Sequence, residues 1–572
     1  MCGIIGIVSK NMFSSQELIT MLKKLEYRGY DSAGIAMTGG SLYIEKSVGK
    51  ISELEKKLKL FSGNAGISQT RWATTGAVTE KNAHPHLDCS KKIAVVHNGI
   101  VENYLELKKD LTKNGHKFES ETDTEVIAHL LENNAPDKVL EMLEGRNAFV
   151  ALKDGKIIVA KNGSPLAEGV GENVNYIASD ALPFLDKTKT IIFLEDGDVA
   201  ELTNSNIKFY GQQREPQHID WSIEAAKKGT YSHYLIKEIM EQPMTINAAV
   251  AQNDEKINEI SRMINSSFGS FFVACGTASH AALAASYFFA KIANKHINFC
   301  VGSEFSSHKH FLTDKSLVIA ISQSGESADT LEAIKIAKEK SAKIISIVNV
   351  PGSTISRQSD YCFLTNAGPE IAVCSTKAFT SQLSVALLFA YAAAGKLEEG
   401  KELLKETSKH VREMLTTEFT EKIKLLSKKI AQKEHLYVIG KGFNYPISLE
   451  TALKIKEVSY MHAEGFASGE LKHGVIALIE KDTPCIAIVA NDEFKQDVLN
   501  GAAEIKLRGG YIIGVSPENH EVFDFWLPVP DAGNASPIVN TIPAQLLAYY
   551  LALERGCDPD YCRNLAKSVT VK

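Results

Sequence analysis

The second half of this 572-residue chain contains one pattern twice, and that repeat limits the folds available to it. An apolar strand, a glycine turn and a long helix occur in "FFVACGTASHAALAASYFFAKI", from Phe271, and again in "LYVIGKGFNYPISLETALKIKEV", from Leu436. Strands that alternate with helices favour a parallel, doubly wound sheet. The sequence therefore predicts two copies of one α/β domain.

The first 210 residues follow a different pattern. Short apolar strands are separated by Gly, Asn and Asp turns, with a few amphipathic helices. This pattern predicts strand-rich layers with helices outside them. The predicted divisions are a domain at 1–210, a linker and helix at 211–243, α/β domains at 244–395 and 433–560 joined by a helical connection at 396–432, and a tail at 561–572.

Composition excludes several classes of partner. The net charge of −6 comes without a basic block, which argues against nucleic acid, and the longest apolar run (385–395) is too short to span a membrane. The nine cysteines are scattered without a CxxC pair, which favours free thiols in a reducing cytoplasm over disulfides or a zinc site. Cys557 and Cys562 are close enough in sequence to suggest metal ligands, but neither a histidine nor a second cysteine pair accompanies them. We expect a cytoplasmic protein without a metal.

A cysteine stands directly behind the initiator methionine in "MCGIIG". Removal of Met1 would place a free α-amine, with an ordinary pKa near ~8, beside the Cys2 thiol as its base. The alternative is that Cys2 is a small apolar residue at the start of a buried strand. Other parts of a site are needed to decide between these interpretations.

Four polar stretches of the first domain supply such parts. Asn98 and Gly99, in "HNGIVEN", offer a side-chain amide and a backbone N–H for an oxyanion. Arg71 offers a planar fork for a carboxylate, and Asp123, in "SETDTE", a counter-charge for an ammonium group. Alone, each of these residues is more often a turn former or a solvated charge.

The order of "MCGIIG", "YRGYDSAG", "RWAT", "NAHPH", "HNGIVEN" and "SETDTE" resembles the class II glutamine amidotransferase domain of the N-terminal-nucleophile hydrolases. The resemblance implies an αββα fold in which Cys2 attacks the glutamine carboxamide, forms a thioester and releases ammonia. It also implies the glutamine-binding residues Arg28, Arg71, Trp72 and Asp123, beside the catalytic Asn98 and Gly99. The chain departs from the family at Thr75, where histidine is usual.

In the second half, "SLVIAISQSGESADTLEAIKIAKE" is a strand, a Ser/Gly-rich turn and a helix. Hydroxyls and N–H groups at a helix N-terminus make a phosphate site, although an ordinary N-capped turn has the same pattern. It is neither a Walker A loop nor a GxGxxG fingerprint. A second hydroxyl-rich turn, "VCSTKAFTSQL", also enters a helix.

These stretches resemble the sugar-isomerase (SIS) domains, which bind phosphosugars. Two positions depart from the family: Ala278 stands where a ligand serine is common, with Ser279 available to compensate, and Ser327 stands where threonine is more usual. The resemblance implies the sugar-phosphate-binding residues Thr277, Ser322, Gln323, Ser324, Ser327, Ser375 and Lys454.

The tail "RNLAKSVTVK" carries Lys567, which at a chain end is ordinarily a flexible, solvated charge. Together with "LETALKIKEVSY" and "SGELKHG", it resembles the enzymes that join this glutaminase to two SIS domains, over nearly the whole chain. The resemblance implies that Lys567 forms an imine with C2 of fructose 6-phosphate and that Glu457 moves a proton between C1 and C2. The resemblance also implies that His473 assists ring opening from a neighbouring subunit, and therefore that the protein is a homodimer.

The implied function is glutamine-dependent conversion of fructose 6-phosphate to glucosamine 6-phosphate and glutamate, without a cofactor. Ammonia would travel along a sealed path, with Trp72 and the tail as its gate. Two alternatives stay open: a non-catalytic phosphosugar-binding regulator, and a relative acting on fructosyl-amines, which Ala278 and Ser327 leave possible. An amidophosphoribosyltransferase would need a pyrophosphate signature of paired aspartates, and the second half contains none.

Overall fold

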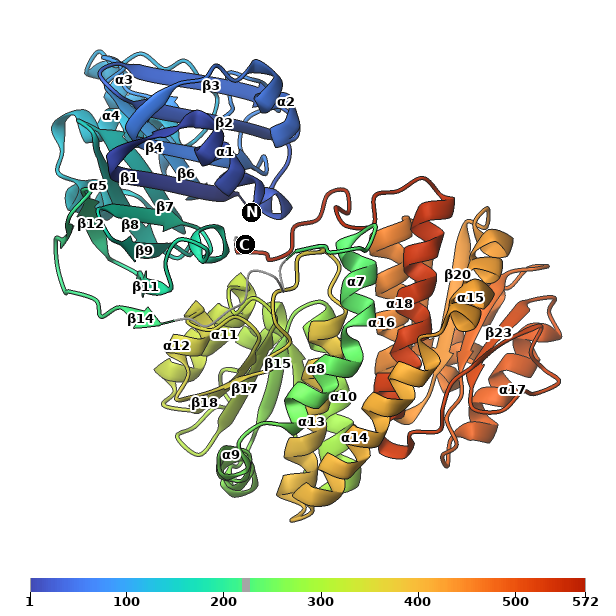
Figure 1. Cartoon of the computed structure of the whole chain (residues 1–572). Helices are drawn as coiled ribbons and strands as arrows, with labels where there is room; N and C mark the ends of the chain where they lie inside the picture. Colours follow the sequence, from blue (N-terminus) through green and yellow to red (C-terminus); the bar gives the residue numbers. More distant parts are fainter. Residues whose placement is uncertain (1, 219–226, 571–572) are drawn as a thin grey trace.

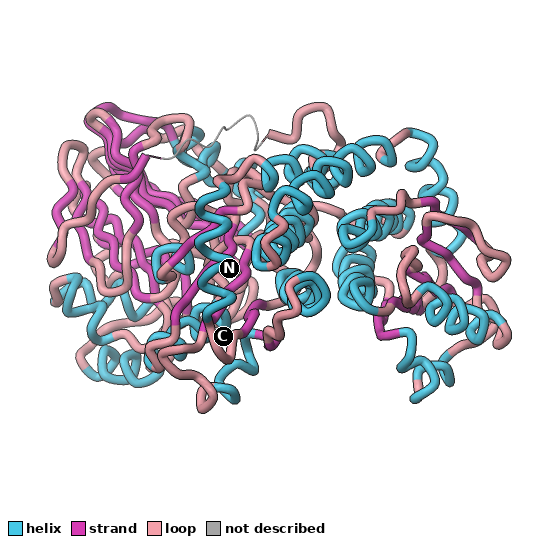
Figure 2. Tube along the Cα trace, turned by 90° about the horizontal axis from the view of Figure 1, so that it is seen from below, coloured by secondary structure: helices cyan, strands magenta, loops and turns pink. Residues whose placement is uncertain are grey.

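The computed structural model describes residues 2–218 and 227–570 (Figures 1 and 2). Met1, part of the predicted linker (219–226) and the last two residues of the predicted tail (571–572) lie outside the described residues. Within the described ranges, no helix combines the length and the apolarity needed to cross a bilayer.

Two stacked antiparallel sheets form the N-terminal domain, with helices on their outer faces (Figure 1). The strand order is β14-β11-β9-β10-β1-β4-β2-β3 in the first sheet and β13-β12-β8-β7-β6-β5 in the second. The strands are β1 (Gly3–Ser14), β2 (Ser32–Thr38), β3 (Leu42–Val48), β4 (Ser62–Arg71), β5 (His86–Leu87), β6 (Ile93–Gly99), β7 (Asn147–Lys153), β8 (Lys156–Asn162), β9 (Ala167–Gly171), β10 (Val174–Ala178), β11 (Thr190–Phe193), β12 (Val199–Leu202), β13 (Ile207–Phe209) and β14 (Gln217–His218).

Strand β1 shows why this domain has four layers. Successive side chains of a strand point to opposite faces. Ile4 and Val8 belong to the apolar core between the two sheets, whereas Ile5 and Ile7 pack under the helices. A strand that is apolar on both faces needs cover on both sides, and the predicted αββα class is confirmed. The helices are α1 (Ser15–Lys23), α2 (Ile51–Lys57), α3 (Tyr104–Lys113), α4 (Glu125–Asn133) and α5 (Pro136–Met142).

The second half contains two five-stranded parallel sheets of the same topology, as the sequence repeat predicts. Their orders are β16-β15-β17-β18-β19 and β21-β20-β22-β23-β24. The strands are β15 (Phe271–Ala274), β16 (Asn298–Val301), β17 (Leu317–Ser322), β18 (Lys343–Val348), β19 (Tyr361–Leu364), β20 (His435–Gly440), β21 (His462–Ala467), β22 (Pro484–Ile488), β23 (Tyr511–Ser516) and β24 (Phe525–Pro528).

Long helices fill the space between the two parallel sheets, and one continuous apolar core joins both domains (Figure 1). Within the domains α10 packs against α13 and α16 against α18, while α10 against α16 and α13 against α18 connect one domain to the other. The helices of this half are α7 (Tyr234–Met240), α8 (Gln242–Val250), α9 (Asp254–Ser266), α10 (Thr277–Ile292), α11 (Ala328–Glu339), α12 (Thr354–Gln358), α13 (Lys377–Ala393), α14 (Leu397–Met414), α15 (Thr417–Ile430), α16 (Tyr445–Ser459), α17 (Lys495–Lys506) and α18 (Ser536–Glu554).

The C-terminal segment leaves α18 and returns between the N-terminal domain and the first parallel sheet (Figure 1). Tyr30 of the N-terminal domain donates a hydrogen bond to the Cys562 carbonyl, at 2.8 Å. Elsewhere on this boundary, Arg357 of α12 donates to the Leu194 carbonyl at 3.0 Å and lies over the Phe193 ring. These contacts hold the N-terminal domain against the first parallel-sheet domain.

Candidate active site

Cys2 lies at the start of β1, half-buried, beside the end of β4. The antiparallel register pairs Gly3 with Thr70, so that Trp72 comes next to the thiol. The Trp72 backbone N–H donates to Cys2 Sγ at 3.2 Å. This contact fixes the position of the sulfur beside the end of β4.

Asn98, at the end of β6, is held in one orientation. Its Nδ2 donates to the Cys2 carbonyl at 2.9 Å and to Ser179 Oγ at 2.8 Å, while its Oδ1 accepts from Gln69 at 3.1 Å. The following residue, Gly99, has φ +124°, and a Cβ there would lie 1.8 Å from the Arg146 carbonyl oxygen. Only glycine fits this position.

Three charged residues predicted to bind glutamine lie around Cys2. Arg28 Nε donates to the Cys2 carbonyl at 3.2 Å, and Asp123 accepts from the Val101 N–H at 2.8 Å. Arg71 is buried, and burial lowers the pKa of its guanidinium, which the Cys2 thiol and Asp123 oppose. Its NH2 group donates to the Thr75 carbonyl. Because this contact uses the backbone, the threonine that replaces the family's histidine does not alter it.

The Ser/Gly-rich turn lies between β17 and α11, as the sequence predicts. Ser322 Oγ accepts from the Gly325 N–H at 3.0 Å and lies 3.3 Å from Ser327 Oγ. Ser324 Oγ lies 2.8 Å from Ser568 Oγ of the tail. The hydroxyls therefore gather at the N-terminus of a twelve-residue helix, where an anion is favoured.

Lys567 is not a free surface charge. Its Nζ lies 2.5 Å from Glu370 Oε2, and the two side chains are 5% and 0% exposed. The same Oε2 accepts from Ser375 Oγ at 2.9 Å, while Oε1 accepts from the Thr376 N–H. Burial alone would raise the pKa of Glu370, but the Lys567 ammonium outweighs it and holds this pKa below its usual value. The tail lysine is thus fixed beside a carboxylate that sequence reasoning missed.

A second buried lysine lies on α16. Lys454 Nζ donates to Glu457 Oε2 at 2.7 Å and to Thr277 Oγ1 at 2.8 Å, and it lies 3.3 Å from Glu450. Burial lowers the pKa of this lysine, but the surrounding acidic groups, Glu450 and Glu457 among them, outweigh that effect and keep the ammonium form. The side chain of Glu457 is thereby held by a fixed positive charge.

The structure brings most of the predicted sugar residues together at the first parallel sheet and α16. Ala278 is buried at the start of α10, and the Ser279 hydroxyl donates to the Gly276 carbonyl at 2.6 Å. Gln323 lines the cavity described below. His473, by contrast, is exposed in a short helical segment, Ser468–His473, that packs against α17.

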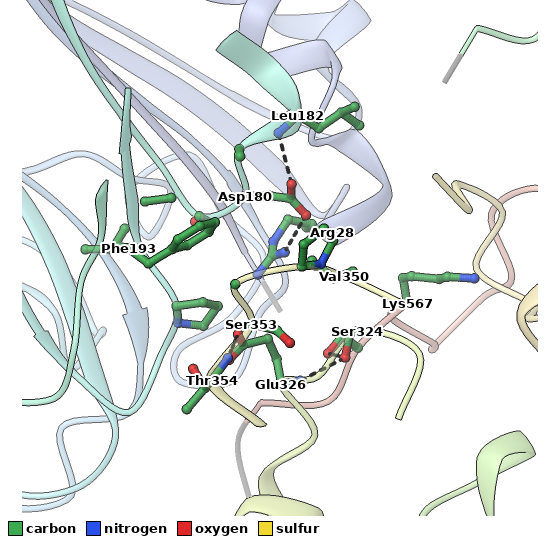
Figure 3. A pocket seen from close by; sticks show the side chains of 18 of the residues that line it. Arg28, Asp180, Leu182, Phe193, Ser324, Glu326, Val350, Ser353, Thr354 and Lys567 are labelled. Atoms are coloured by element: carbon green, nitrogen blue, oxygen red, sulfur yellow. Dashed lines mark hydrogen bonds and ion pairs between the residues drawn. The ribbon is translucent and has the colours of Figure 1, made fainter. Parts of the chain in front are cut away.

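One cavity lies between the N-terminal domain and the first parallel-sheet domain (Figure 3). Arg28 and Asp180 line it on one side, and Ser324, Glu326 and Lys567 line it on the other. Much of the remaining wall is apolar, with Leu166, Leu182, Phe193 and Val350 among its residues. Because Arg28 also donates to the Cys2 carbonyl, the wall of this cavity includes both a direct partner of Cys2 and the tail lysine.

Several contact residues were missed from sequence. Glu450 had a usable signal, since Glu450, Lys454 and Glu457 follow each other at the spacing of one helix face. Ser179 and Gln69 lie in strand and loop segments without distinctive spacing, and Glu370 is 197 residues from Lys567. No local pattern predicts such contacts.

Comparison with known families agrees with this arrangement. Residues 70–186 match the glutamine amidotransferase domain family, and residues 264–392 and 429–555 each match the SIS domain family. The fold and the site therefore define a glutamine amidotransferase that carries two SIS domains.

Full-length relatives narrow the class. Curated glutamine–fructose-6-phosphate aminotransferases (isomerizing) from Aquifex aeolicus and Fusobacterium nucleatum are 41% and 42% identical to this chain over 595 and 614 residues, covering all of both chains in each case. A solved C-terminal domain of glucosamine-fructose-6-phosphate aminotransferase from Francisella tularensis is 37% identical with a TM-score of 0.54, and it covers 58% of this chain and 99% of that one. The chain belongs to the glutamine–fructose-6-phosphate aminotransferase (isomerizing) family.

Proposed function

We propose that this enzyme hydrolyses glutamine at Cys2 and uses the ammonia to convert fructose 6-phosphate to glucosamine 6-phosphate at a site around Lys567. The six-part division at 1–210, 211–243, 244–395, 396–432, 433–560 and 561–572 is part of the proposal. The observation that carries it is the cavity whose wall includes both Arg28, a direct partner of Cys2, and Lys567.

The glutaminase half needs a nucleophile, an oxyanion site and an amino-acid clamp. After Met1 is removed, the Cys2 α-amine takes the thiol proton and the sulfur attacks the carboxamide carbon. Asn98 and the Gly99 backbone stabilise the oxyanion, and the α-ammonium returns its proton to the nitrogen, so that ammonia leaves as the thioester forms. Water then hydrolyses the thioester, which releases glutamate and restores the Cys2 thiol. Arg71 and Asp123 hold the α-carboxylate and α-ammonium of glutamine, with Arg28 and Trp72 enclosing the site.

In the sugar half, the Lys567 amine adds to C2 of the open-chain ketose and water leaves, which gives an imine. Glu370 lies where it can accept the proton that Lys567 must lose before attack. Ammonia then displaces the lysine, and Glu457 transfers a proton from C1 to C2. Ser322, Gln323, Ser324 and Ser327 hold the phosphate; Thr277, Ser375 and Lys454 position the sugar and Glu457.

The apolar wall of the cavity suits the passage of a neutral molecule such as ammonia. Ammonia that escapes to water is protonated and no longer nucleophilic, so a dry passage preserves it. Trp72 contacts Cys2, and Lys567 and Ser568 of the tail line the cavity, which supports their proposed role as a gate.

The reaction is tested by incubating the protein with glutamine and fructose 6-phosphate and measuring glutamate and amino sugar. We expect both products in equal amounts, and Cys2→Ala should abolish glutamine use while phosphosugar isomerisation persists. A regulator would bind fructose 6-phosphate without turnover, and an enzyme for fructosyl-amines would leave it unconverted. Full glutamine-dependent synthesis by Cys2→Ala would refute the nucleophile.

Lys567 is tested separately by trapping. Borohydride reduction of the enzyme with fructose 6-phosphate should fix the sugar covalently to a C-terminal peptide, and Lys567→Ala should yield no adduct. An adduct of the same yield on Lys567→Ala would place the imine elsewhere.

We also propose a cytoplasmic homodimer. All nine cysteines are free, which suits a reducing compartment. His473 is exposed, which suits a residue that serves a neighbouring subunit's sugar site. Mixing inactive His473→Ala and Lys567→Ala chains should restore part of the activity, because mixed dimers regain one intact site. No recovery after subunit exchange would show that His473 acts within its own chain.

A further inference from the structure

A cluster of four potential metal ligands lies on the outer side of the N-terminal domain, apart from the cavity and from Cys2. It consists of Cys89, His116, His129 and Glu132, and their donor atoms all lie within 4.8 Å of one another. We propose that these four residues bind one Zn²⁺ ion. This site takes no part in the proposed reaction. The cysteine spacing in the sequence predicts no metal site.

The four ligands come from three segments that the fold brings together. Cys89 lies in the turn between β5 and β6, and His116 lies in the loop between α3 and α4. His129 and Glu132 are three residues apart on α4, so both face the same side of the helix. The chain separation of 43 residues between Cys89 and Glu132 hides the cluster from motif searches.

The donor distances match a tetrahedral site. Cys89 Sγ lies 3.7 Å from His116 Nδ1 and 3.5 Å from His129 Nδ1. Glu132 Oε1 lies 3.3 Å from His116 Nδ1 and 3.0 Å from His129 Nδ1. A tetrahedral zinc with Zn–S near ~2.3 Å and Zn–N near ~2.0 Å places its ligand atoms about 3.3–3.6 Å apart. Small side-chain shifts would therefore complete the coordination sphere.

The chemistry of the donor set selects the ion. A thiolate, two imidazoles and a carboxylate are ligands that Zn²⁺ uses, whereas Mg²⁺ and Ca²⁺ require oxygen ligands. Cys89 is exposed, so an ion can enter from solvent, and its thiol proton is released to solvent on binding. Four protein ligands leave no open position for a substrate, which indicates a structural site.

The surroundings support ligation by His129. This histidine is buried, and its Nε2 makes no hydrogen bond to any described residue but faces Glu125 Oε1 at 3.6 Å. A ligating histidine commonly directs its other ring nitrogen at a carboxylate, which orients the ring. The Lys117 backbone N–H lies 3.4 Å from Cys89 Sγ and would donate to the bound thiolate.

Zinc at this position would join segments that carry the glutamine site. Strand β6 follows the Cys89 turn and ends at Asn98 and Gly99, while Asp123 comes directly before α4. A bound ion would fix the turn to the helix and stabilise the folded state by mass action.

The test uses untagged, full-length protein loaded with a small excess of ZnCl₂ and freed of unbound metal by gel filtration. All samples carry His435→Gln, because exposed His435 and His462, with Nδ1 atoms 3.0 Å apart, offer a second place for an ion. Elemental analysis should find one zinc per chain, and at least ~10-fold less in Cys89→Ser. The matched control Cys557→Ser should keep its zinc.

Two further readouts cover a variant that folds poorly. Co²⁺ added to the metal-free parent should give a thiolate-to-cobalt charge-transfer band in the near ultraviolet, with the visible bands of a tetrahedral ion. Zinc should raise the thermal unfolding midpoint of the parent but not that of His116→Ala. His116 lies in a loop, so this substitution removes a ligand without altering a helix or a strand. Equal zinc contents in the parent and Cys89→Ser, or a cobalt spectrum without the thiolate band, would overturn the proposal.

Discussion

A methyl group at Gly99 should disable the glutaminase without harming the sugar site. The residue has φ +124°, and an added Cβ would lie 1.8 Å from the Arg146 carbonyl oxygen. Real Cβ contacts do not fall below 3.0 Å, so the end of β6 and the facing chain must separate by about 1.2 Å. That movement strains the Ile100 N–H to Arg146 carbonyl bond, now 3.1 Å, and shifts Asn98 away from Cys2.

The magnitude follows from the displacement. Moving an oxyanion donor by about 1 Å costs roughly 10²-fold in rate, and losing one costs about 10²–10³-fold. We therefore expect Gly99→Ala to lower glutamate release by about 10²–10³-fold. Isomerisation of fructose 6-phosphate, measured without glutamine, should stay within a factor of about two, because the sugar residues belong to the other half of the chain.

Gly40→Ala is the matched control. Gly40 also has positive φ, +102°, but among residues 2–218 and 227–570 no atom beyond its own chain neighbours lies within 4 Å of its added Cβ. It therefore carries the backbone strain without the collision. If Gly99→Ala releases glutamate as fast as Gly40→Ala, the role given to the end of β6 is wrong.

Two further predictions concern burial and the domain boundary. Glu168 is buried, and its two carboxylate oxygens lack partners among the described residues. Burial and, to a smaller extent, the nearby Asp198 raise the pKa of Glu168 from 4.5 to about 8. As pH rises, this carboxyl ionises in the unfolded chain before it ionises in the folded one, so the wild type loses up to about 5 kcal/mol of folding stability between pH 4.5 and 8. In Glu168→Gln the thermal unfolding midpoint should therefore fall less steeply over this pH range. The same pH dependence in the variant and the wild type would refute the prediction. Arg357→Ala, which removes the contacts to Leu194 and Phe193, should raise the ratio of glutamate to amino sugar above one, whereas a ratio of one would show that this contact does not seal the passage.

The fold class was predictable because its signals are local. The second half repeats a pattern of strand, glycine turn and helix. Each copy of this pattern can be recognised within about 30 residues, which is the size of a βαβ unit. The αββα layers were harder to derive from periodicity. Strand β1 is apolar on both faces, so it lacks the alternation that marks a half-buried strand, and the resemblance rather than the pattern supplied the layer order.

The residues of the candidate site were likewise predictable only where the signal is local in sequence. Asn98 and Gly99 are neighbours in sequence. The short motifs of the first domain predict both as site residues, together with Arg28 and Trp72. Glu370 was missed, because its pairing with Lys567 depends on where the tail returns, which no local pattern encodes.

The zinc cluster was missed for a similar reason. Its ligands are spread over three segments, and only the spacing of His129 and Glu132 on α4 is visible in the sequence. Cys557 and Cys562, five residues apart, are a more visible pair in the sequence, whereas Cys89 is 27 residues from His116, the nearest histidine of the cluster.

The transfer of nitrogen between the two halves is tested most directly by isotope competition. Enzyme with fructose 6-phosphate and amide-¹⁵N glutamine is given an excess of unlabelled ammonium, and the amino sugar is analysed by mass spectrometry. A product that keeps the glutamine label, undiluted by bulk ammonium, is the expected result. Label diluted to the composition of the solution would mean that ammonia leaves the protein before it meets the ketose.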